Sequence, residues 1–218
     1  MKEYHKIQTV FLCDPDTNYK TLLEGQWALP EFQYLALNEW VFTEKVDGTN
    51  IRVMFNGFAD TVTFGGKTDK AQIPTFLLDK LRELFPNNEK FKEVFCDNEN
   101  HAIDVCLYGE GYGAKIQKGG GNYRKDQSFV LFDVLVGDWW LQRKNVESIA
   151  AQFGIEVTPI VAEGDLYQMV DLARKGFFSQ WGDFLAEGIV ARPAVELKAR
   201  NGNRVITKLK ARDFDHQR

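Results

Sequence analysis

The sequence predicts a single α+β domain built largely from antiparallel strands with helices beside them. Three observations lead to this prediction. Short apolar or alternating runs recur between Gly and Asn residues, and three longer segments repeat apolar residues every three or four positions. The chain also contains no internal repeat, low-complexity tract or Pro- and Ser-rich linker. We therefore expect residues 1–218 to form one compact domain.

Seven runs are typical of strands, because they alternate or concentrate apolar, β-branched and aromatic residues. In chain order they are residues 39–44, 50–55, 60–64, 102–110, 128–136, 187–193 and 203–210. Asn201-Gly202 lies between two strand-like runs and indicates a hairpin turn. The two-residue period of a strand then places Lys208 and Lys210 on the same face of the last run.

Three segments are typical of amphipathic helices. They are residues 74–85, 143–153 and 165–175. In the first segment Leu77, Leu81 and Leu84 fall on one helical face, and Val146 and Ile149 do so in the second. These faces are expected to cover the sheets.

Charge and composition exclude several classes of protein. The formal net charge is −4 and the pI is about 5.5, which argues against binding nucleic acid by bulk electrostatics, so any such contact must be local. No segment approaches the roughly 20 apolar residues of a membrane span. The first ten residues also lack the layout of a secretory signal. We therefore predict a cytoplasmic protein with no membrane partner.

The cysteines and histidines suggest neither a disulfide framework nor a metal site. Cys13, Cys96 and Cys106 are odd in number and lack CxxC spacing, so we expect them to be reduced and mostly buried. The histidines are scattered, at positions 5, 101 and 216.

The stretch "EKVDGTN" carries the first candidate for chemistry. Lys45 follows a predicted strand and precedes the turn at Gly48, where a side chain can project into a pocket. A lysine becomes a nucleophile only after it loses its proton, which burial or neighbouring cations promote. Taken alone, the KxDG pattern equally fits a surface turn after a strand.

Further polar residues mark the ends or edges of later predicted strands. Glu110 ends one run, Phe132 and Asp133 lie within the next, and Glu187 begins another. Lys208 and Lys210 lie in the last run. Each has a structural alternative: a core phenylalanine, a turn carboxylate or solvated lysines.

The ordered series KxDG, YGE, FD, EGIV and KxK, from Glu44 to Lys210, resembles the covalent nucleotidyltransferases: ATP-dependent DNA ligases, RNA ligases and messenger-RNA capping enzymes. The triplet "GTN" and the stretch "GEGYGAKIQKGGGNY" are similar to nick-sealing RNA ligases of the RNA ligase 2 type. The resemblance implies the nucleotidyltransferase (adenylation) domain fold.

It also implies an ATP-dependent RNA ligase that acts in three steps. Lys45 would attack the α-phosphorus of ATP and retain AMP, AMP would pass to an RNA 5′-phosphate, and an RNA 3′-hydroxyl would displace it. The implied catalytic residues are Lys45, Glu187, Lys208 and Lys210. ATP and Mg²⁺, with Mn²⁺ as an alternative metal, would be the cofactors. RNA ends or a nicked RNA duplex would be the substrate, with an accessory RNA-binding protein as a further partner.

The resemblance assigns nucleotide contacts residue by residue. Glu44 would meet the adenine edge and Glu110 the ribose hydroxyls, while Phe132, or Phe129 as the alternative, would stack on the base. Lys208 and Lys210 would bind the phosphates, and Glu187 would hold Mg²⁺ through its waters. Further contacts with the nucleotide would come from Asp47, Gly48, Asn50, Arg52 and Lys67. Lys67 stands where the family usually has arginine. The positive charge is kept, but the two parallel hydrogen bonds that an arginine side chain can donate are lost.

Only eight residues follow Lys210. The sequence is therefore expected to contain neither the OB-fold domain of DNA ligases and capping enzymes nor a C-terminal helical RNA-binding domain, and we expect RNA binding to be weak or partner-dependent. Three alternatives stay open: a capping-type adenylyl- or guanylyltransferase, a DNA ligase, and a catalytically inert nucleotide-binding module.

Overall fold

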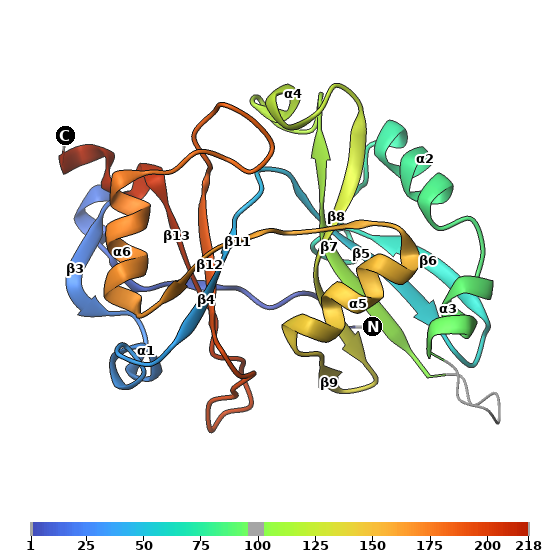
Figure 1. The fold of residues 1–218 in the computed structure, drawn as a ribbon, viewed down its shortest axis with the longest axis horizontal. Helices are drawn as coiled ribbons and strands as arrows, with labels where there is room; N and C mark the ends of the chain where they lie inside the picture. The colour runs from blue at the N-terminus through green and yellow to red at the C-terminus, as the bar shows by residue number, and fades with distance from the viewer. Residues whose placement is uncertain (1, 96–102, 218) are drawn as a thin grey trace. The chain divides into compact units, whose positions relative to one another are not determined.

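The computed structural model describes residues 2–95 and 103–217, and the chain divides into two compact units (Figure 1). Unit 1 comprises Met1–His5 and Asp47–Thr158, and unit 2 comprises Lys6–Val46 and Pro159–Arg218. The chain therefore passes between the units after His5, Val46 and Thr158. The division into units does not test the expectation of a single domain over residues 1–218, which stays a prediction.

Unit 1 contains a six-stranded sheet in the order β10-β8-β7-β5-β6, with β9 paired to β8. The strands are β5 (Thr49–Asn56), β6 (Thr61–Gly65), β7 (Val105–Gly113), β8 (Gln127–Val136), β9 (Trp139–Trp140) and β10 (Glu156–Val157). Only the short β10 runs parallel to its neighbour. The central strands are long and mostly buried, and one face of the sheet is strongly apolar.

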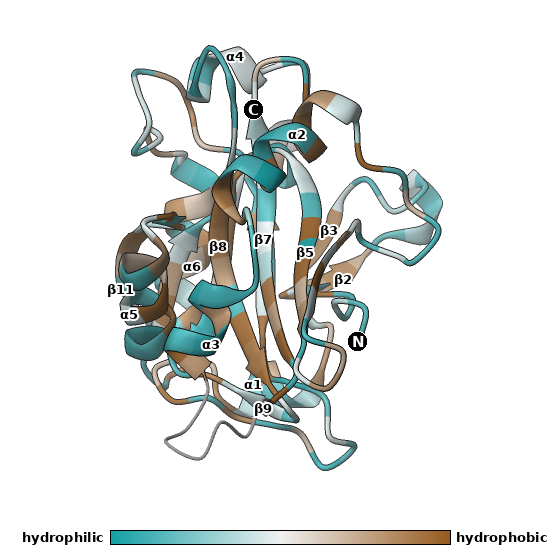
Figure 2. Cartoon of the chain, turned by 90° about the vertical axis from the view of Figure 1, so that its right-hand side faces the viewer, coloured by the Kyte–Doolittle hydropathy of each residue, from teal (hydrophilic) through white to brown (hydrophobic). Residues whose placement is uncertain are grey.

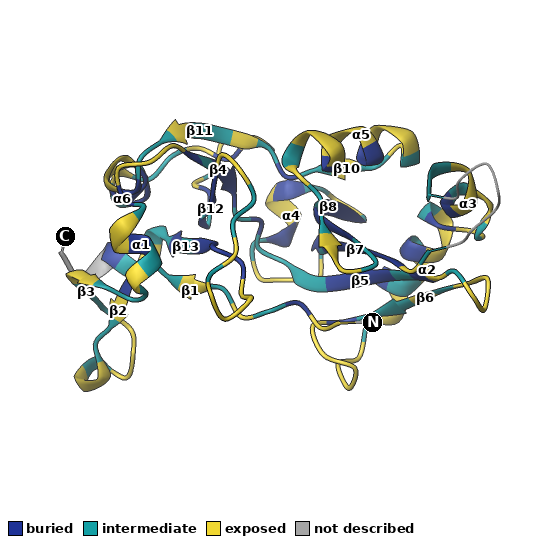
Figure 3. Cartoon of the chain, turned by 90° about the horizontal axis from the view of Figure 1, so that it is seen from below, coloured by how far each residue is buried: buried dark blue, intermediate teal, exposed yellow. Residues whose placement is uncertain are grey.

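Helices of unit 1 cover that apolar face. They are α2 (Thr75–Leu84), α3 (Glu89–Phe95) and α5 (Arg143–Phe153), and a short helix α4 (Gly120–Tyr123) follows β7. Leu77 and Leu81 of α2 and Ile149 of α5 pack with Ile51 and Val53 of β5 in one core. Figure 2 shows hydrophobic stretches on β5 and β8, and Figure 3 shows the exposed outer side of α5.

The opposite face of this sheet is covered by residues 2–5. Tyr4 donates a hydrogen bond to the buried carboxylate of Asp133, and its ring meets the Phe132 ring edge-on at 5.1 Å. A bulge in β8 inserts Phe132, because Tyr108 pairs with Asp133 while Gly109 pairs with Leu131.

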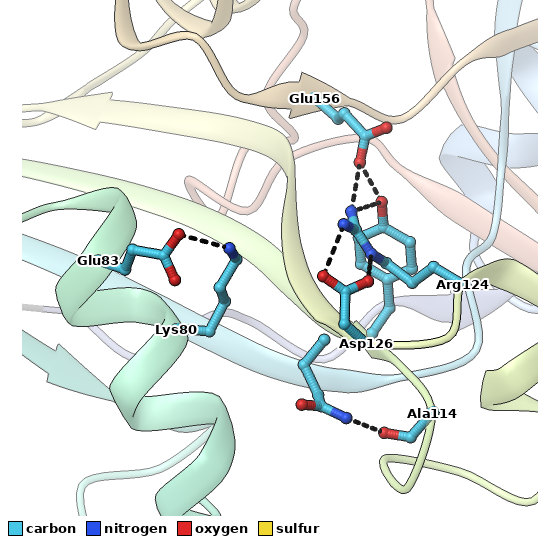
Figure 4. A network of polar contacts seen from close by, with 8 residues as sticks. Lys80, Glu83, Ala114, Arg124, Asp126 and Glu156 are labelled. Carbon is cyan, nitrogen blue, oxygen red and sulfur yellow. Dashed lines mark hydrogen bonds and ion pairs between the residues drawn. The ribbon is translucent and has the colours of Figure 1, made fainter.

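Arg124 closes the loop between β7 and β8. Its Nε lies 2.6 Å from Asp126 Oδ1, and its Nη1 lies 3.6 Å from Glu156 (Figure 4). Two carboxylates thus neutralise this arginine, whereas Lys115 and Lys118 of the same loop are exposed. Lys125 of this loop is exposed as well, so the loop presents three exposed lysines.

Unit 2 contains a five-stranded sheet in the order β1-β13-β12-β4-β11 and a separate β2-β3 pair. The strands are β1 (Gln8–Thr9), β2 (Phe11–Cys13), β3 (Leu22–Trp27), β4 (Trp40–Glu44), β11 (Ile160–Gly164), β12 (Gly188–Pro193) and β13 (Thr207–Lys210). The helices are α1 (Pro30–Tyr34), α6 (Leu166–Lys175) and the 3₁₀ turns η1 (Pro15–Thr17) and η2 (Ala211–Gln217). All pairs are antiparallel except β1-β13.

Helix α6 and β4 supply much of the core of unit 2. Trp40 and Phe42 pack in one cluster with Met169 of α6 and Leu209 of β13. The helix begins at a capping box. The Asp165 side chain accepts a hydrogen bond from the backbone N–H of Gln168, and the Gln168 side-chain oxygen accepts one from the backbone N–H of Asp165.

All seven predicted strands and all three predicted helices are present, which confirms the α+β fold class. The Asn201-Gly202 turn is also present, with Gly202 at φ 84°, and its arms form a short antiparallel pairing at the bridge between Lys198 and Arg204. Ala199 N–H donates to Asn203 O at 2.7 Å, and Val205 N–H donates to Leu197 O at 2.9 Å. Arg204 is buried and donates to Glu196 at 2.8 Å, which adds an ion pair across the same arms.

Cys106 is buried, Cys13 is half-buried, and neither is in a disulfide within the described residues; Cys96 lies outside them. Burial raises the pKa of the Cys106 thiol to about 12. Among the described residues, no helix has the length and apolar character that a bilayer crossing requires.

Candidate active site

Three neighbouring strand ends of unit 2 meet at one edge of its sheet. Ile189 pairs with Glu44, and Gly188 pairs with Lys210, so the end of β4, the start of β12 and the end of β13 lie side by side. Lys45 follows β4, and its backbone N–H donates to Gly188 O at 2.9 Å. This geometry brings together the side chains of Lys45, Glu187 and Lys210.

Glu187 bridges the two lysines. Lys45 Nζ donates to Glu187 Oε2, and Lys210 Nζ lies 2.8 Å from Glu187 Oε1. The relative solvent exposure of the side chain is 22% for Lys45, 15% for Glu187 and 21% for Lys210. Lys208 is partly exposed on the same face of β13 as Lys210. The site is thus a cationic cluster around one carboxylate, reachable from solvent.

The carboxyl group of Glu187 is held ionised by its neighbours. Burial alone would raise its pKa, but the charges and hydrogen bonds of Lys45 and Lys210 outweigh burial and hold the pKa below its ordinary value of 4.5. At neutral pH the ionised carboxylate therefore pairs with both lysine side chains.

This shift predicts an acid-dependent loss of stability. Because the folded-state pKa is depressed, Glu187 stabilises the native state above pH 4.5, and that contribution disappears as pH falls through the folded pKa. We expect the unfolding free energy of wild type to exceed that of Glu187→Gln at neutral pH, and the gap to narrow near about pH 3. Denaturant midpoints at both pH values measure this gap, and a gap independent of pH would contradict the assignment.

Local features hold the ends of β12 and β13 in place. A Cβ on Gly188 would lie 2.1 Å from Leu209 O, so only glycine allows β13 to approach. Asp213 Oδ2 accepts the Lys210 N–H at 2.8 Å, and burial raises the pKa of this carboxyl despite that bond and the nearby cations. Asp213 was missed from sequence, although an acid three residues after Lys210 was a visible signal.

Glu44 is buried at the end of β4, with 1% of its surface exposed. Its Oε2 accepts the Gln180 N–H at 2.8 Å. Oε1 is buried and has no hydrogen-bond partner among the residues that the structure describes. Burial raises the pKa of Glu44 despite the bond from Gln180 and the nearby Ser179 side chain.

In unit 1, several predicted nucleotide contacts share one face of the sheet. Asn50 lies directly opposite the half-buried Glu110, and Arg52 lies opposite Tyr108. The Arg52 side chain is fully buried and donates to Asp69 at 2.7 Å and to Gly66 O at 2.8 Å. These contacts are typical of a structural arginine that holds two segments of the chain together.

Three more predicted residues differ in their surroundings. Phe129 is buried in the helix-covered core, where its ring meets Phe85 at 5.7 Å. Phe132 is only partly buried and lies on the Tyr4 side of the sheet. Lys67 is exposed beside Gly66.

The turn after Lys45 is bound by the loop that contains α4. Asp47 N–H donates to Tyr123 Oη at 3.1 Å, and Gln117 Nε2 donates to Gly48 O at 3.0 Å. A Cβ on Gly48 would lie 2.3 Å from Gly111 O, so glycine is required for this close approach. Gln117 and Tyr123 were missed as site residues, although both lie in the stretch that carried the resemblance.

The predicted site residues are divided between the two units. Unit 2 contains Glu44, Lys45, Glu187, Lys208 and Lys210, and unit 1 contains Asp47, Gly48, Asn50, Arg52, Lys67, Glu110 and Phe132. Over residues 2–95 and 103–217, no three His, Cys, Asp or Glu side chains gather as a metal site.

Fold and cluster together define a ligase-type nucleotidyltransferase, and a family model agrees. The model described as RNA ligase matches residues 38–210, most of the chain, so the chain belongs to the RNA ligase family. The same span contains the lysine, glutamate and lysine of the cluster in unit 2.

Solved structures of Naegleria gruberi RNA ligase have a similar fold. A mutant with ATP and Mn aligns with a TM-score of 0.70 at 16% identity, covering 100% of this chain and 58% of that one. The protein with PPi gives 0.69 at 17%, covering 100% and 58%, and a mutant with AMP and Mn gives 0.69 at 16%, covering 98% and 57%. This chain thus spans less than two thirds of those proteins. A comparison with curated proteins found no match.

Proposed function

We propose that this chain is an ATP-dependent RNA ligase that joins 3′-hydroxyl and 5′-phosphate RNA ends through AMP bound covalently to Lys45. The observation that carries the proposal is the contact of Glu187 with both Lys45 and Lys210, in a chain of the RNA ligase family. The nucleotide, pyrophosphate and Mn in the similar Naegleria structures add support.

In the first step Lys45 Nζ, after releasing a proton to water, attacks the α-phosphorus of ATP. The new N–P bond forms as the P–O bond to pyrophosphate breaks. Lys210, whose ammonium lies 2.8 Å from Glu187, is positioned to offset negative charge that moves onto phosphate oxygens. Lys208, on the same face, would add a second cation.

The donor set at Glu187 fits Mg²⁺ or Mn²⁺. Mg²⁺ is usually bound by one or two carboxylates together with waters and substrate phosphates, and Glu187 offers one partly exposed carboxylate. When bound, the metal would neutralise phosphate charge. The contribution of the chain is to hold the Glu187 carboxylate between the two lysines.

We propose the following contacts with the nucleotide. Glu44 would accept from adenine, Glu110 would meet the ribose, and Phe132 would stack on the base. We favour Phe132 over Phe129 because the Phe129 ring is packed in the core. The other proposed contacts come from Asp47, Gly48, Asn50, Arg52 and Lys67.

The RNA substrate would be bound locally. We propose the sealing of nicks in RNA duplexes, as in the RNA ligase 2 type, with exposed Lys115 and Lys118 contacting phosphates. An accessory RNA-binding protein is a further proposed partner, because the net charge of −4 gives little general attraction to RNA.

Intact-protein mass spectrometry tests the proposal. The protein is incubated with ATP or GTP and Mg²⁺ or Mn²⁺, the labelled residue is mapped, and the adduct is chased with nicked RNA, single-stranded RNA or nicked DNA. We expect an AMP-sized gain on Lys45 and transfer to RNA. A gain with GTP alone would indicate a capping-type enzyme, transfer to DNA alone a DNA ligase, and no adduct, including none carried from purification, a binding module.

A further inference from the structure

The segment that contains Lys210 is anchored in the core of unit 2 on both sides. Leu209 precedes Lys210 and is fully buried, and Phe214 follows four residues after Lys210 with 2% of its surface exposed. Both side chains belong to one core cluster. The turn η2 lies beside α6 (Figure 1), and the Arg174 guanidinium of that helix is 5.1 Å from the centroid of the Phe214 ring. The path of the chain from Leu209 to Phe214 is therefore fixed at its two ends.

Within this segment, Asp213 binds the backbone of Lys210. Asp213 Oδ2 accepts the Lys210 N–H at 2.8 Å, in a partly buried position. The next backbone group makes a second link, because the Ala211 N–H donates to Glu187 O at 3.0 Å. Two consecutive N–H groups at the end of β13 thus have partners outside the strand pairing.

These links determine where the Lys210 side chain begins. Lys210 is the last residue of β13, and the ends of secondary-structure elements open more readily than their centres. Asp213 and Glu187 restrain the backbone there, and Lys210 Nζ lies 2.8 Å from Glu187 Oε1. Asp213 therefore acts on the ammonium group through the backbone of Lys210.

The charge of Asp213 has an effect separate from its hydrogen bond. Burial raises the pKa of this carboxyl, while the positive charges of Lys210, Arg212 and Lys208 oppose that shift. A negative charge close to these cations weakens their attraction for phosphate. The hydrogen bond, and not the charge, is therefore the feature of Asp213 that favours a phosphate-binding Lys210.

We propose that Asp213 is a positioning residue for Lys210: its acceptor oxygen fixes the backbone so that the ammonium group is in place before ATP binds. This inference rests on the proposed function and extends it to a residue outside the five motifs. An ammonium group that is already in place need not be ordered during the reaction, so it offsets phosphate charge at a lower cost in entropy.

The test compares wild type with Asp213→Ala and Asp213→Asn. Single-turnover adduct rates are measured at saturating ATP, and dissociation constants for ATP and adenosine are measured without divalent metal. We expect Asp213→Ala to react about tenfold more slowly and to bind ATP about fivefold more weakly, with adenosine binding unchanged, because Lys210 meets phosphates only. Asp213→Asn should match wild type within about twofold, since an amide oxygen also accepts the Lys210 N–H. Asp171→Ala, at an exposed aspartate on α6, is the matched control.

An adduct rate of Asp213→Ala within about twofold of wild type would overturn the inference. So would an equal loss of ATP and adenosine binding, or an Asp213→Asn protein as slow as Asp213→Ala. If wild type forms no adduct, the proposed function fails, and the binding of ATP against adenosine still tests Asp213. If Asp213→Ala does not fold, hydrogen exchange of the Lys210 amide in wild type replaces it. We then expect slow exchange without ATP, and fast exchange that only ATP slows would contradict the positioning role.

Discussion

Lys45→Ala is expected to abolish the AMP adduct, with a residual rate at least about 1,000-fold below wild type. No other group can supply the nitrogen at this position, because Lys210, the other lysine bonded to Glu187, is the proposed phosphate-binding cation. Lys45→Arg should be equally inactive while keeping a cation beside Glu187. Intact-protein mass after incubation with ATP and Mg²⁺ measures both variants.

Lys144→Ala is the matched control for this prediction, since Lys144 is an exposed lysine on α5. It should form adduct at the wild-type rate. Denaturation of Lys45→Arg should show a folded protein, which separates lost chemistry from lost structure. An adduct of normal yield on Lys45→Arg would place the nucleophile elsewhere and remove the basis of the proposed mechanism.

Glu187→Gln is expected to slow adduct formation by about 100-fold or more. The amide keeps the size of the side chain but leaves Lys45 and Lys210 without the carboxylate that joins them. It also removes the proposed metal-binding charge. Because the three side chains are partly exposed, we expect only about 1–2 kcal/mol of lost stability at neutral pH.

Single-turnover rates and denaturant midpoints measure the two effects of Glu187→Gln separately. Glu163→Gln is the control, because Glu163 is an exposed glutamate on β11 of the same sheet. It should match wild type in both measurements. A Glu187→Gln protein with normal adduct rates at all metal concentrations would show that the carboxylate is dispensable and that Lys45 is oriented by other groups.

Much of the site in unit 2 could be predicted because its residues flank strongly patterned strands. The runs at 39–44 and 187–193 each contain three consecutive apolar residues, and their ends carry Lys45 and Glu187. The two-residue period also correctly placed Lys208 and Lys210 on one face of β13. The bridging of both Lys45 and Lys210 by one carboxylate was not predictable, since it depends on strand order and register.

Other features depend on contacts between separate segments of the chain, so no local sequence pattern predicts them. Alternation places Arg52 away from the core side of β5, yet the loop with Asp69 covers it completely. The extra residue at Phe132 is a bulge, which shifts register without a sequence signal. Gln180 lies in a loop that no sequence pattern marks, and it meets the site only through its backbone bond to Glu44. The division into two units was not predictable from the sequence, because each unit is assembled from separate segments of the chain.

The position of β4 in its sheet has a consequence for synthesis of the chain. Both of its partners, β11 and β12, come more than 100 residues later, and Lys45 and Glu187 are 142 positions apart. Pairing at such separation is slow, because a long loop must close before any contact forms. On the ribosome, β4 is therefore a strand without partners until β11 and β12 have been translated. The lysine cluster is complete only once Lys210 has emerged as well, so the site cannot assemble from the amino-terminal segments alone.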